Sequence, residues 1–111
     1  MPPEQDETVE LRAFRGSRRA SVYRSHAVSG AAFARILESG ASYELALLAS
    51  LGRTGPHELD KESARQLAAE ANEIRKSGEL LDLDGDLVAI AELARWCARA
   101  PARSWMTIEG P

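Results

Sequence analysis

The feature that most constrains this fold is a pair of amphipathic helical patterns between Glu58 and Ala100, joined by a short acidic connector. Apolar residues recur with helical spacing in both patterns: Ala64, Leu67, Ala68, Ala71 and Ile74, then Leu87, Ile90, Ala91, Ala94 and Cys97. The polar side of the first pattern, predicted to point away from the core, holds Glu62, Gln66, Glu70 and Glu73. Asp60 is a predicted N-cap, Gly78 a left-handed stop and Pro101 a terminator. We expect this helix pair to be the scaffold of the domain.

The connector resembles the start of a calcium-binding loop, because Asp82, Asp84 and Asp86 alternate with other residues. An EF-hand loop also needs glycine at its sixth position and glutamate at its twelfth. Counting from Asp82 puts leucine at both positions, and counting so that Gly85 is sixth puts Leu80 first. We therefore predict no metal site, and a turn in which Asp84 or Asp86 caps the next helix.

The N-terminal segment has the period-two alternation of a β-hairpin, with strands over 8–15 and 18–25. Gly16-Ser17 fits a two-residue type II′ turn, since glycine accepts the positive φ that this turn requires. That turn predicts a core face of Val9, Leu11, Ala13, Ala20 and Val22, with Leu11 opposite Val22. The outer face would carry Thr8, Glu10, Arg12, Phe14, Arg19, Ser21 and Tyr23, with Phe14 opposite Arg19 and Glu10 opposite Tyr23.

The remaining segments complete an α+β domain. Residues 1–7 combine two prolines with acids, which predicts a disordered tail before one domain over 8–111. Ser29 is a predicted N-cap for a helix that ends at Gly40. Residues 41–51 fit a buried helix better than a central strand, although short apolar runs suit both. Residues 105–108 form a last strand that pairs with the hairpin, so the expected order is β-β-α-α-α-α-β, with three to four helices covering a small antiparallel sheet.

Composition excludes several classes of protein. The formal net charge of −3 does not drive the chain towards nucleic acid or membrane. No run of about 18 apolar residues predicts a transmembrane helix, and the polar, acidic N-terminus is unlike a signal peptide. Cys97 is the single cysteine and cannot form an internal disulfide, so we expect a reduced, cytoplasmic location.

The sequence offers no catalytic constellation. Cys97 lies on an apolar helix stripe, where a free cysteine behaves as a small hydrophobe. His26 and His57 fall in predicted loops and share no spacing with acids or with the cysteine. No phosphate-binding loop, dinucleotide fingerprint or zinc-ligand set occurs. We expect a protein that is not an enzyme and holds no cofactor.

Charge is unevenly distributed and favours a binding function. Residues 11–35 contain six arginines and no acid, whereas residues 38–92 contain twelve acids against five basic residues. We predict an acidic docking face for another, basic protein, made of Glu79, Asp82, Asp84 and Asp86. Small inhibitors that cover a basic enzyme site, such as the immunity proteins of bacterial toxins, share this size and charge as an analogy only. A homodimer is also compatible with these features.

The alternative function is nucleic-acid binding by the hairpin. Arg12, Phe14, Arg19 and Tyr23 alternate cation and aromatic ring on the predicted outer face, as a stacking surface for single strands does. The same side chains would serve as core or as ordinary sheet stabilisation if the register were different.

Overall fold

The computed structural model describes residues 8–16, 22–52 and 56–110. The elements in chain order are β1 (Thr8–Arg15), β2 (Val22–Ser29), α1 (Gly30–Ser42), α2 (Ala46–Ser50), β3 (His57–Leu59), α3 (Lys61–Ser77), the 3-10 helix η1 (Leu81–Leu83), α4 (Asp84–Ala98) and β4 (Ser104–Glu109). This confirms the α+β class and adds strand β3, a segment in which we had predicted only a loop and a helix start. The predicted tail over 1–7 lies outside the described residues.

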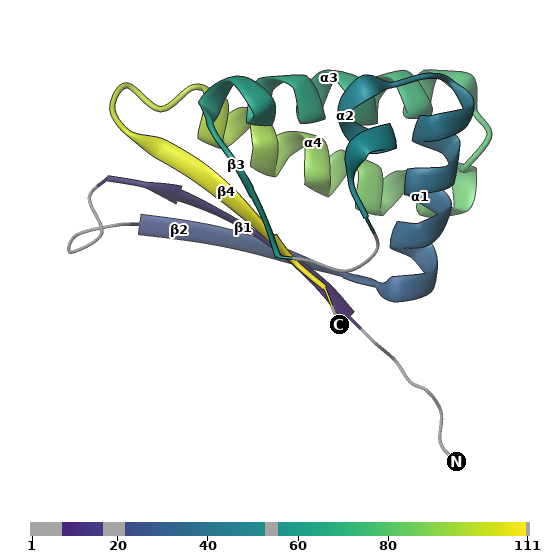
Figure 1. Ribbon diagram of the computed structural model, residues 1–111, viewed down its shortest axis with the longest axis horizontal. Helices are drawn as coiled ribbons and strands as arrows, with labels where there is room; N and C mark the ends of the chain where they lie inside the picture. The colour runs from purple at the N-terminus through teal and green to yellow at the C-terminus, as the bar shows by residue number, and fades with distance from the viewer. Residues whose placement is uncertain (1–7, 17–21, 53–55, 111) are drawn as a thin grey trace, which may run out of the picture.

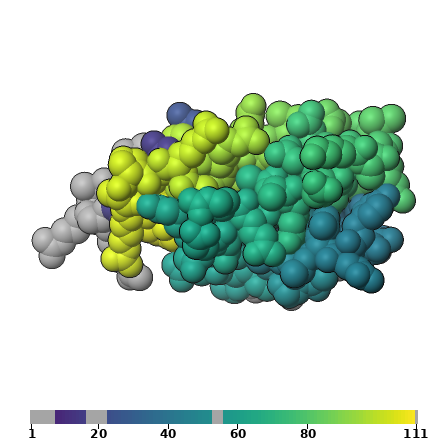
Figure 2. Space-filling view, turned by 90° about the horizontal axis from the view of Figure 1, so that it is seen from above, coloured from purple at the N-terminus to yellow at the C-terminus, as the bar shows by residue number. Residues whose placement is uncertain are grey.

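The strands form one antiparallel sheet in the order β2-β1-β4-β3, so the hairpin and the C-terminal strand lie side by side as predicted. All four α-helices lie over one face of this sheet (Figure 1). The helix side is seen in Figure 2, where the green surfaces of α3 and α4 lie beside the blue-to-teal surfaces of α1 and α2. The core fills the space between the two layers with buried side chains, among them Val9, Leu11, Ala13, Ile36, Leu67, Ile74, Leu87, Ile90, Met106 and Ile108.

Several local predictions are confirmed. The Ser29 hydroxyl accepts a hydrogen bond from the Ala32 amide at 3.1 Å at the start of α1. The Asp60 carboxylate accepts one from the Ser63 amide at 2.8 Å at the start of α3, and Gly78 ends that helix with a φ of 73°. Residues 41–42 and 46–50 are helical, so a helix and not a strand is confirmed for this segment, but its predicted burial is wrong: Leu48 is the only buried residue of α2. Each of these helix ends could be predicted from the sequence, because capping depends on one residue and its immediate neighbours.

The predicted hairpin register is wrong. Leu11 lies opposite His26, four residues beyond Val22, and Phe14 lies opposite Tyr23 instead of Arg19. The shift replaces Arg24 with Val28 opposite Val9, so two buried valines meet at the core face. Because four is an even number, each β1 side chain keeps its predicted face. Positions 17–21, which include Arg19 and Ala20, lie outside the described residues.

The predicted helix stop at Gly40 is also wrong. The helix α1 continues to Ser42, and Glu44 takes the positive φ of 57°. Gly40 is buried because α2 packs closely against it: a Cβ at this position would lie 2.4 Å from the Cβ of Leu48. Here glycine permits a close approach of two helices and does not form a turn.

Glu70 does not point away from the core as predicted. It is 6% exposed, and its carboxylate accepts hydrogen bonds from the amides of Leu47 and Leu48 at 3.0 and 2.8 Å. The Gln66 side chain donates a further bond at 2.8 Å. The helix α2 has no side-chain cap of its own, so an acid from α3 supplies the missing acceptors.

The predicted capping role of Asp84 and Asp86 is wrong in detail. The residue at the N-cap of α4 is Leu83, which makes no side-chain capping bond, and both acids fall inside the first turn of the helix. Their charge still favours the positive end of the helix dipole. Among the described residues, no helix has the length and apolarity needed to cross a bilayer.

Candidate functional site

The sheet face opposite the helices is called the open face here, because no helix in the described part of the chain covers it (Figure 1). Side chains alternate across a strand, so the residues between the buried ones point to this face. Its members are Glu10, Arg12, Phe14, Tyr23, Ser25, Ala27, Glu58, Trp105, Thr107 and Glu109. The structure thus brings the predicted residues Arg12, Phe14 and Tyr23 onto one surface.

Three rings on the open face form a continuous aromatic row made of Tyr23, Phe14 and Trp105. Phe14 lies opposite Tyr23 on β2 and opposite Trp105 on β4. The ring centroids of Phe14 and Trp105 are 5.1 Å apart with the planes at 13°, and those of Phe14 and Tyr23 are 5.7 Å apart. Tyr23 is 59% exposed. Aromatic contacts of this kind contribute about 0.5–1.5 kcal/mol per pair, so the row is a preorganised apolar surface beside solvent.

The rest of the open face is polar and carries more acid than base. Arg12 donates to Glu10 at 2.8 Å, and this contact raises the pKa of the arginine. Glu58 and Glu109 make no ion pair within the described residues. The Nε of Arg12 and the Oγ1 of Thr107, on residues opposite each other, are shielded and find no hydrogen-bond partner in the described part of the chain. These two groups lie at the middle of the open face and are unsatisfied in the isolated chain.

A hollow of about 420 Å³ adjoins the aromatic row at Trp105. Its walls come from β3, β4 and the start of α3 and comprise Glu58, Leu59, Asp60, Ser63, Arg103, Ser104 and Trp105. The Arg103 guanidinium lies 5.8 Å from the Trp105 ring centroid, a cation–π distance. The hollow therefore offers a ring face, carboxylates and a cation within one depression next to the row.

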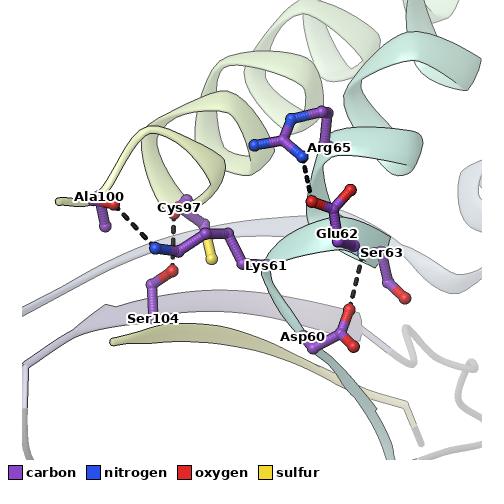
Figure 3. Close-up of polar contacts among 8 residues, drawn as sticks. All are labelled: Asp60, Lys61, Glu62, Ser63, Arg65, Cys97, Ala100 and Ser104. Carbon is purple, nitrogen blue, oxygen red and sulfur yellow. Dashed lines mark hydrogen bonds and ion pairs between the residues drawn. The ribbon is translucent and has the colours of Figure 1, made fainter. Parts of the chain in front are cut away.

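Polar contacts fix one wall of this hollow (Figure 3). Lys61 Nζ donates to the carbonyls of Ala100 and Ala102 at 2.9 and 2.8 Å, just beyond the C-terminal end of α4. The Ser104 hydroxyl donates to the Cys97 carbonyl at 2.8 Å. The carbonyls at a helix end have no partner within the helix, so these bonds tie β4 and α3 to α4.

The acidic connector is defined here by the four carboxylates of the predicted docking face, Glu79, Asp82, Asp84 and Asp86. Asp82 accepts two hydrogen bonds from Arg35 at 2.6 and 3.2 Å, and this contact lowers the pKa of the aspartate. Asp86 meets His26 Nε2 at 2.9 Å. Both contacts join the acid-rich range 38–92 to the arginine-rich range 11–35, so the two ranges are not separated in the fold.

The other two connector acids also have partners inside the chain. Asp84 accepts from Arg75 Nε at 2.9 Å, and the Ser39 hydroxyl donates to Glu79 at 3.4 Å. Three of the four acids thus meet a basic side chain of the same molecule. The structure brings this set together at one end of the helix layer, where Asp82 and Asp84 each face an arginine of the same chain.

The candidate catalytic groups have unreactive surroundings. Cys97 is fully buried, and burial raises the pKa of its thiol, which disfavours the nucleophilic thiolate. His26 lies in β2 and His57 in β3, not in loops as predicted, and His26 pairs with an acid sixty positions away. The Nε2 of His57 is shielded without a partner among the described residues. Within the same residues, no three histidine, cysteine or acidic side chains lie together as metal ligands would.

A cationic groove of about 300 Å³ separates α3 from α4 on the helix side, and the sequence analysis missed it. Arg65, Arg95 and Arg99 line it together with Asn72 and small alanines. Arg65 is paired with Glu62. The other two arginines lie near the C-terminal end of α4, where cations compensate the helix dipole. That structural role accounts for their position.

Comparisons of this chain with protein-family models, with curated proteins and with solved structures found no match. The open face must therefore be interpreted from its own residues. The sequence analysis missed the third ring of the aromatic row, although the signal was present: Met106 and Ile108 alternate with Trp105 and Thr107. Because the apolar pair had to face the core, Trp105 had to face outward.

Proposed function

We propose that this protein is a non-enzymatic binding protein that docks a basic protein surface through its open face. The observation that carries the proposal is the aromatic row of Tyr23, Phe14 and Trp105 on a sheet face without helices, flanked by unpaired acids. Aromatic residues and arginine are enriched in protein interfaces and dominate their binding energy. The row is wide enough to cross three strands, which suits a surface partner better than a single small molecule.

The charge of the open face favours a basic protein over a nucleic acid. Glu10, Glu58 and Glu109 outnumber the two described cations on and beside the face, Arg12, which Glu10 already pairs, and Arg103, which lies over the Trp105 ring. Phosphate groups would be repelled by this arrangement, whereas lysine and arginine side chains of a partner would be attracted. The hollow beside Trp105 adds the carboxylate of Asp60, which suits a partner's cationic side chain, while Arg103 of this chain already lies over the ring.

The open face is a better candidate than the acidic connector predicted from the sequence. Docking on the connector would have to compete with the contacts to Arg35, Arg75 and His26 that already hold its acids. Docking on the open face breaks no ion pair at Glu58 or Glu109. Small inhibitors that cover a basic enzyme site remain the class of protein closest to this proposal, by analogy of size and charge. A reducing cytoplasm suits the unpaired Cys97.

The test is capture from an extract of the native host with matched variants. Tyr23→Ala and Trp105→Ala shorten two members of the aromatic row, and Tyr43→Ala removes a comparably exposed tyrosine from the end of α1. The proposal predicts one stoichiometric protein that binds wild type and Tyr43→Ala and is lost from both row variants. Equal capture by all four proteins would contradict it.

The nucleic-acid alternative is tested in the same series. The row and Arg12 together still present a stacking surface with a cation, which is the observation that favours it. A labelled single-stranded oligonucleotide is titrated at low salt against wild type and the Arg12→Ala/Arg19→Ala double variant. Binding that the double variant loses would favour nucleic acid and contradict the protein-docking proposal.

A further inference from the structure

The two edges of the sheet differ sharply in how well they are protected against pairing with another strand. β3 is an edge of only three residues, directly preceded by Pro56, which has no amide hydrogen, and directly followed by the N-cap residue of α3. Short edge strands and proline are devices that prevent edge-to-edge association. β2 is an edge of eight residues that contains no proline and one fixed charge, Arg24.

The direction of the backbone groups along β2 follows from the hydrogen-bond alternation of the sheet. The Gly16 amide donates to the Arg103 carbonyl at 2.9 Å, so these two residues form a hydrogen-bonded pair between β1 and β4. In an antiparallel sheet such pairs alternate, so the odd-numbered β1 residues bond to β2. Their partners there are the even-numbered residues, which leaves Tyr23, Ser25 and Ala27 with amides and carbonyls directed to the outside edge.

This outside edge is accessible. Tyr23, Arg24, Ser25 and Ala27 are all exposed, and no strand lies beyond β2 in the described part of the chain. The edge thus presents a ladder of about six backbone donors and acceptors over five residues.

We propose that β2 pairs antiparallel with β2 of a second copy of this chain, around a two-fold axis at Ser25. The two four-stranded sheets would then join into one continuous sheet of eight strands. Ser25 exchanges hydrogen bonds with its own copy at the axis, and Tyr23 exchanges them with Ala27 of the other copy. Such an isologous contact is the commonest symmetry of soluble oligomers.

The side chains of β2 favour this register and this occupant. On the open face a large side chain, Tyr23, lies opposite the small Ala27, so the pair packs without conflict. On the helix face Arg24, whose guanidinium lies 4.8 Å from the Trp96 ring centroid of its own chain, would lie opposite His26 of the other copy, whose ring contacts Asp86, so no like fixed charges meet. A register with the axis at Arg24 would set like charges against each other. The strand therefore complements itself.

The inference shares Tyr23 with the proposed function but rests on the backbone edge of β2, and its measurement is the mass of the chain alone, so the two proposals can fail separately. Sedimentation equilibrium of the full chain is expected to give twice the monomer mass of 12.1 kDa. Ser25→Pro removes an outward amide hydrogen that has no strand partner among the described residues, and is expected to shift the mass to that of the monomer. Glu58→Pro, the matched change at an outward amide of β3, is expected to leave the dimer mass unchanged.

Cross-linking keeps the inference testable if the proline variant does not fold. Wild type has only the buried Cys97, so Ser25→Cys adds one accessible thiol at the axis. Residues in a hydrogen-bonded antiparallel pair have Cα atoms about 5.5 Å apart, within the range that a disulfide spans. Mild oxidation is expected to give a covalent dimer for Ser25→Cys and none for Glu58→Cys. A monomeric wild type, or a dimer whose Ser25→Cys variant is not cross-linked, would overturn the inference.

Discussion

The acidic connector and the open face differ in whether their charged side chains find partners within the chain. The connector has the densest acidic stretch of the chain, yet Asp82, Asp84 and Asp86 each contact a basic side chain of the same molecule. The open face has as many charged side chains as the connector, but its rings contact one another, and Glu58 and Glu109 make no ion pair within the described residues. A dense run of acidic residues predicts that basic groups will lie beside it. The sequence does not show whether those basic groups belong to a partner or to the same chain.

The physical reason for the difference is where each region lies. The connector joins α3 to α4 and meets residues of α1 and β2, so its acids are within reach of cations from the first third of the chain. The open face lies on the far side of the sheet from every helix (Figure 1). Apart from the residues of the hollow beside Trp105, its side chains contact mainly each other. Side chains without partners in the described part of the chain, which are available to bind another molecule, therefore lie on the sheet face that no helix covers.

The largest expected effect is on partner affinity. Shortening Trp105 to alanine removes the ring that ends the aromatic row and borders the hollow, and hot-spot residues of this kind cost at least about 2 kcal/mol, or about 30-fold in Kd. The matched change in the connector, Leu81→Ala, removes a side chain that is 74% exposed and is expected to leave the affinity unchanged. Calorimetric titration of the captured partner against both variants compares the two regions directly. A greater loss of affinity in Leu81→Ala than in Trp105→Ala would mean that the connector, and not the open face, contacts the partner.

Substitution of two glycines by alanine is expected to change the free energy of unfolding in opposite directions. One glycine lies in the α1–α2 contact and the other in the connector. Gly40→Ala forces a Cβ against Leu48 and is expected to lower the free energy of unfolding by about 1–3 kcal/mol. Gly85→Ala meets nothing within 4 Å and stands at an ordinary φ inside α4, so a gain of up to about 1 kcal/mol is expected. Urea unfolding monitored by circular dichroism measures both. If Gly40→Ala were neutral, the close approach of α2 would not be as described.

Alanine substitution of one buried and one surface glutamate is expected to change the free energy of unfolding by different amounts. Glu70→Ala leaves the amides of Leu47 and Leu48 without an acceptor in a buried place, at an expected cost of about 1–3 kcal/mol. Glu79→Ala, within the connector, is expected to change stability by less than about 0.5 kcal/mol. Glu70→Gln preserves one carbonyl acceptor and should fall between them. Comparable unfolding midpoints for Glu70→Ala and Glu79→Ala would show that Glu70 does not anchor α2.

The smallest expected effect is a pH dependence that originates in the connector. The contact with Arg35 lowers the pKa of Asp82 below the ordinary value of 3.8, and the Ser63 amide does the same for Asp60. The unfolded state therefore binds more protons as the pH falls, so this stabilisation is present above about pH 4 and is lost on acidification through the native pKa values. Tm should decline below about pH 4, and Asp82→Asn should make the decline shallower. If Tm declined equally steeply with falling pH in wild type and in Asp82→Asn, the Arg35–Asp82 ion pair would not contribute to stability.

Much of the fold was predictable because its signals are local. Ser29, Asp60 and Gly78 cap helices through bonds to their own neighbours, and the stripes of α3 and α4 follow the helical period. The register of β2 was not predictable, because Arg15 pairs with Val22, which leaves more residues between the two strands than the two that Gly16-Ser17 suggested. Strand β3 is too short to carry a periodic pattern of its own.

The candidate site was predictable only in part. Arg12, Phe14 and Tyr23 were assigned to one face because a strand alternates its side chains, and a register shift of four preserved that face. The neighbours of these residues depended on the register and on β4, so the stacking of Phe14 on Trp105 could not be derived. Two of the connector's ion pairs, Arg35–Asp82 and His26–Asp86, join residues 47 and 60 positions apart, separations at which the sequence carries no local signal.

The central claim is that the open face, and not the acidic connector, contacts the partner. Its most direct test places a photoreactive side chain on each surface, as Tyr23→p-benzoylphenylalanine and Leu81→p-benzoylphenylalanine, at two exposed apolar positions. Both proteins are irradiated in the native host, and adducts of the chain with itself, at twice 12.1 kDa, are scored separately. The account predicts a discrete adduct with a second protein from position 23 and none from position 81. An adduct from position 81 alone would contradict it.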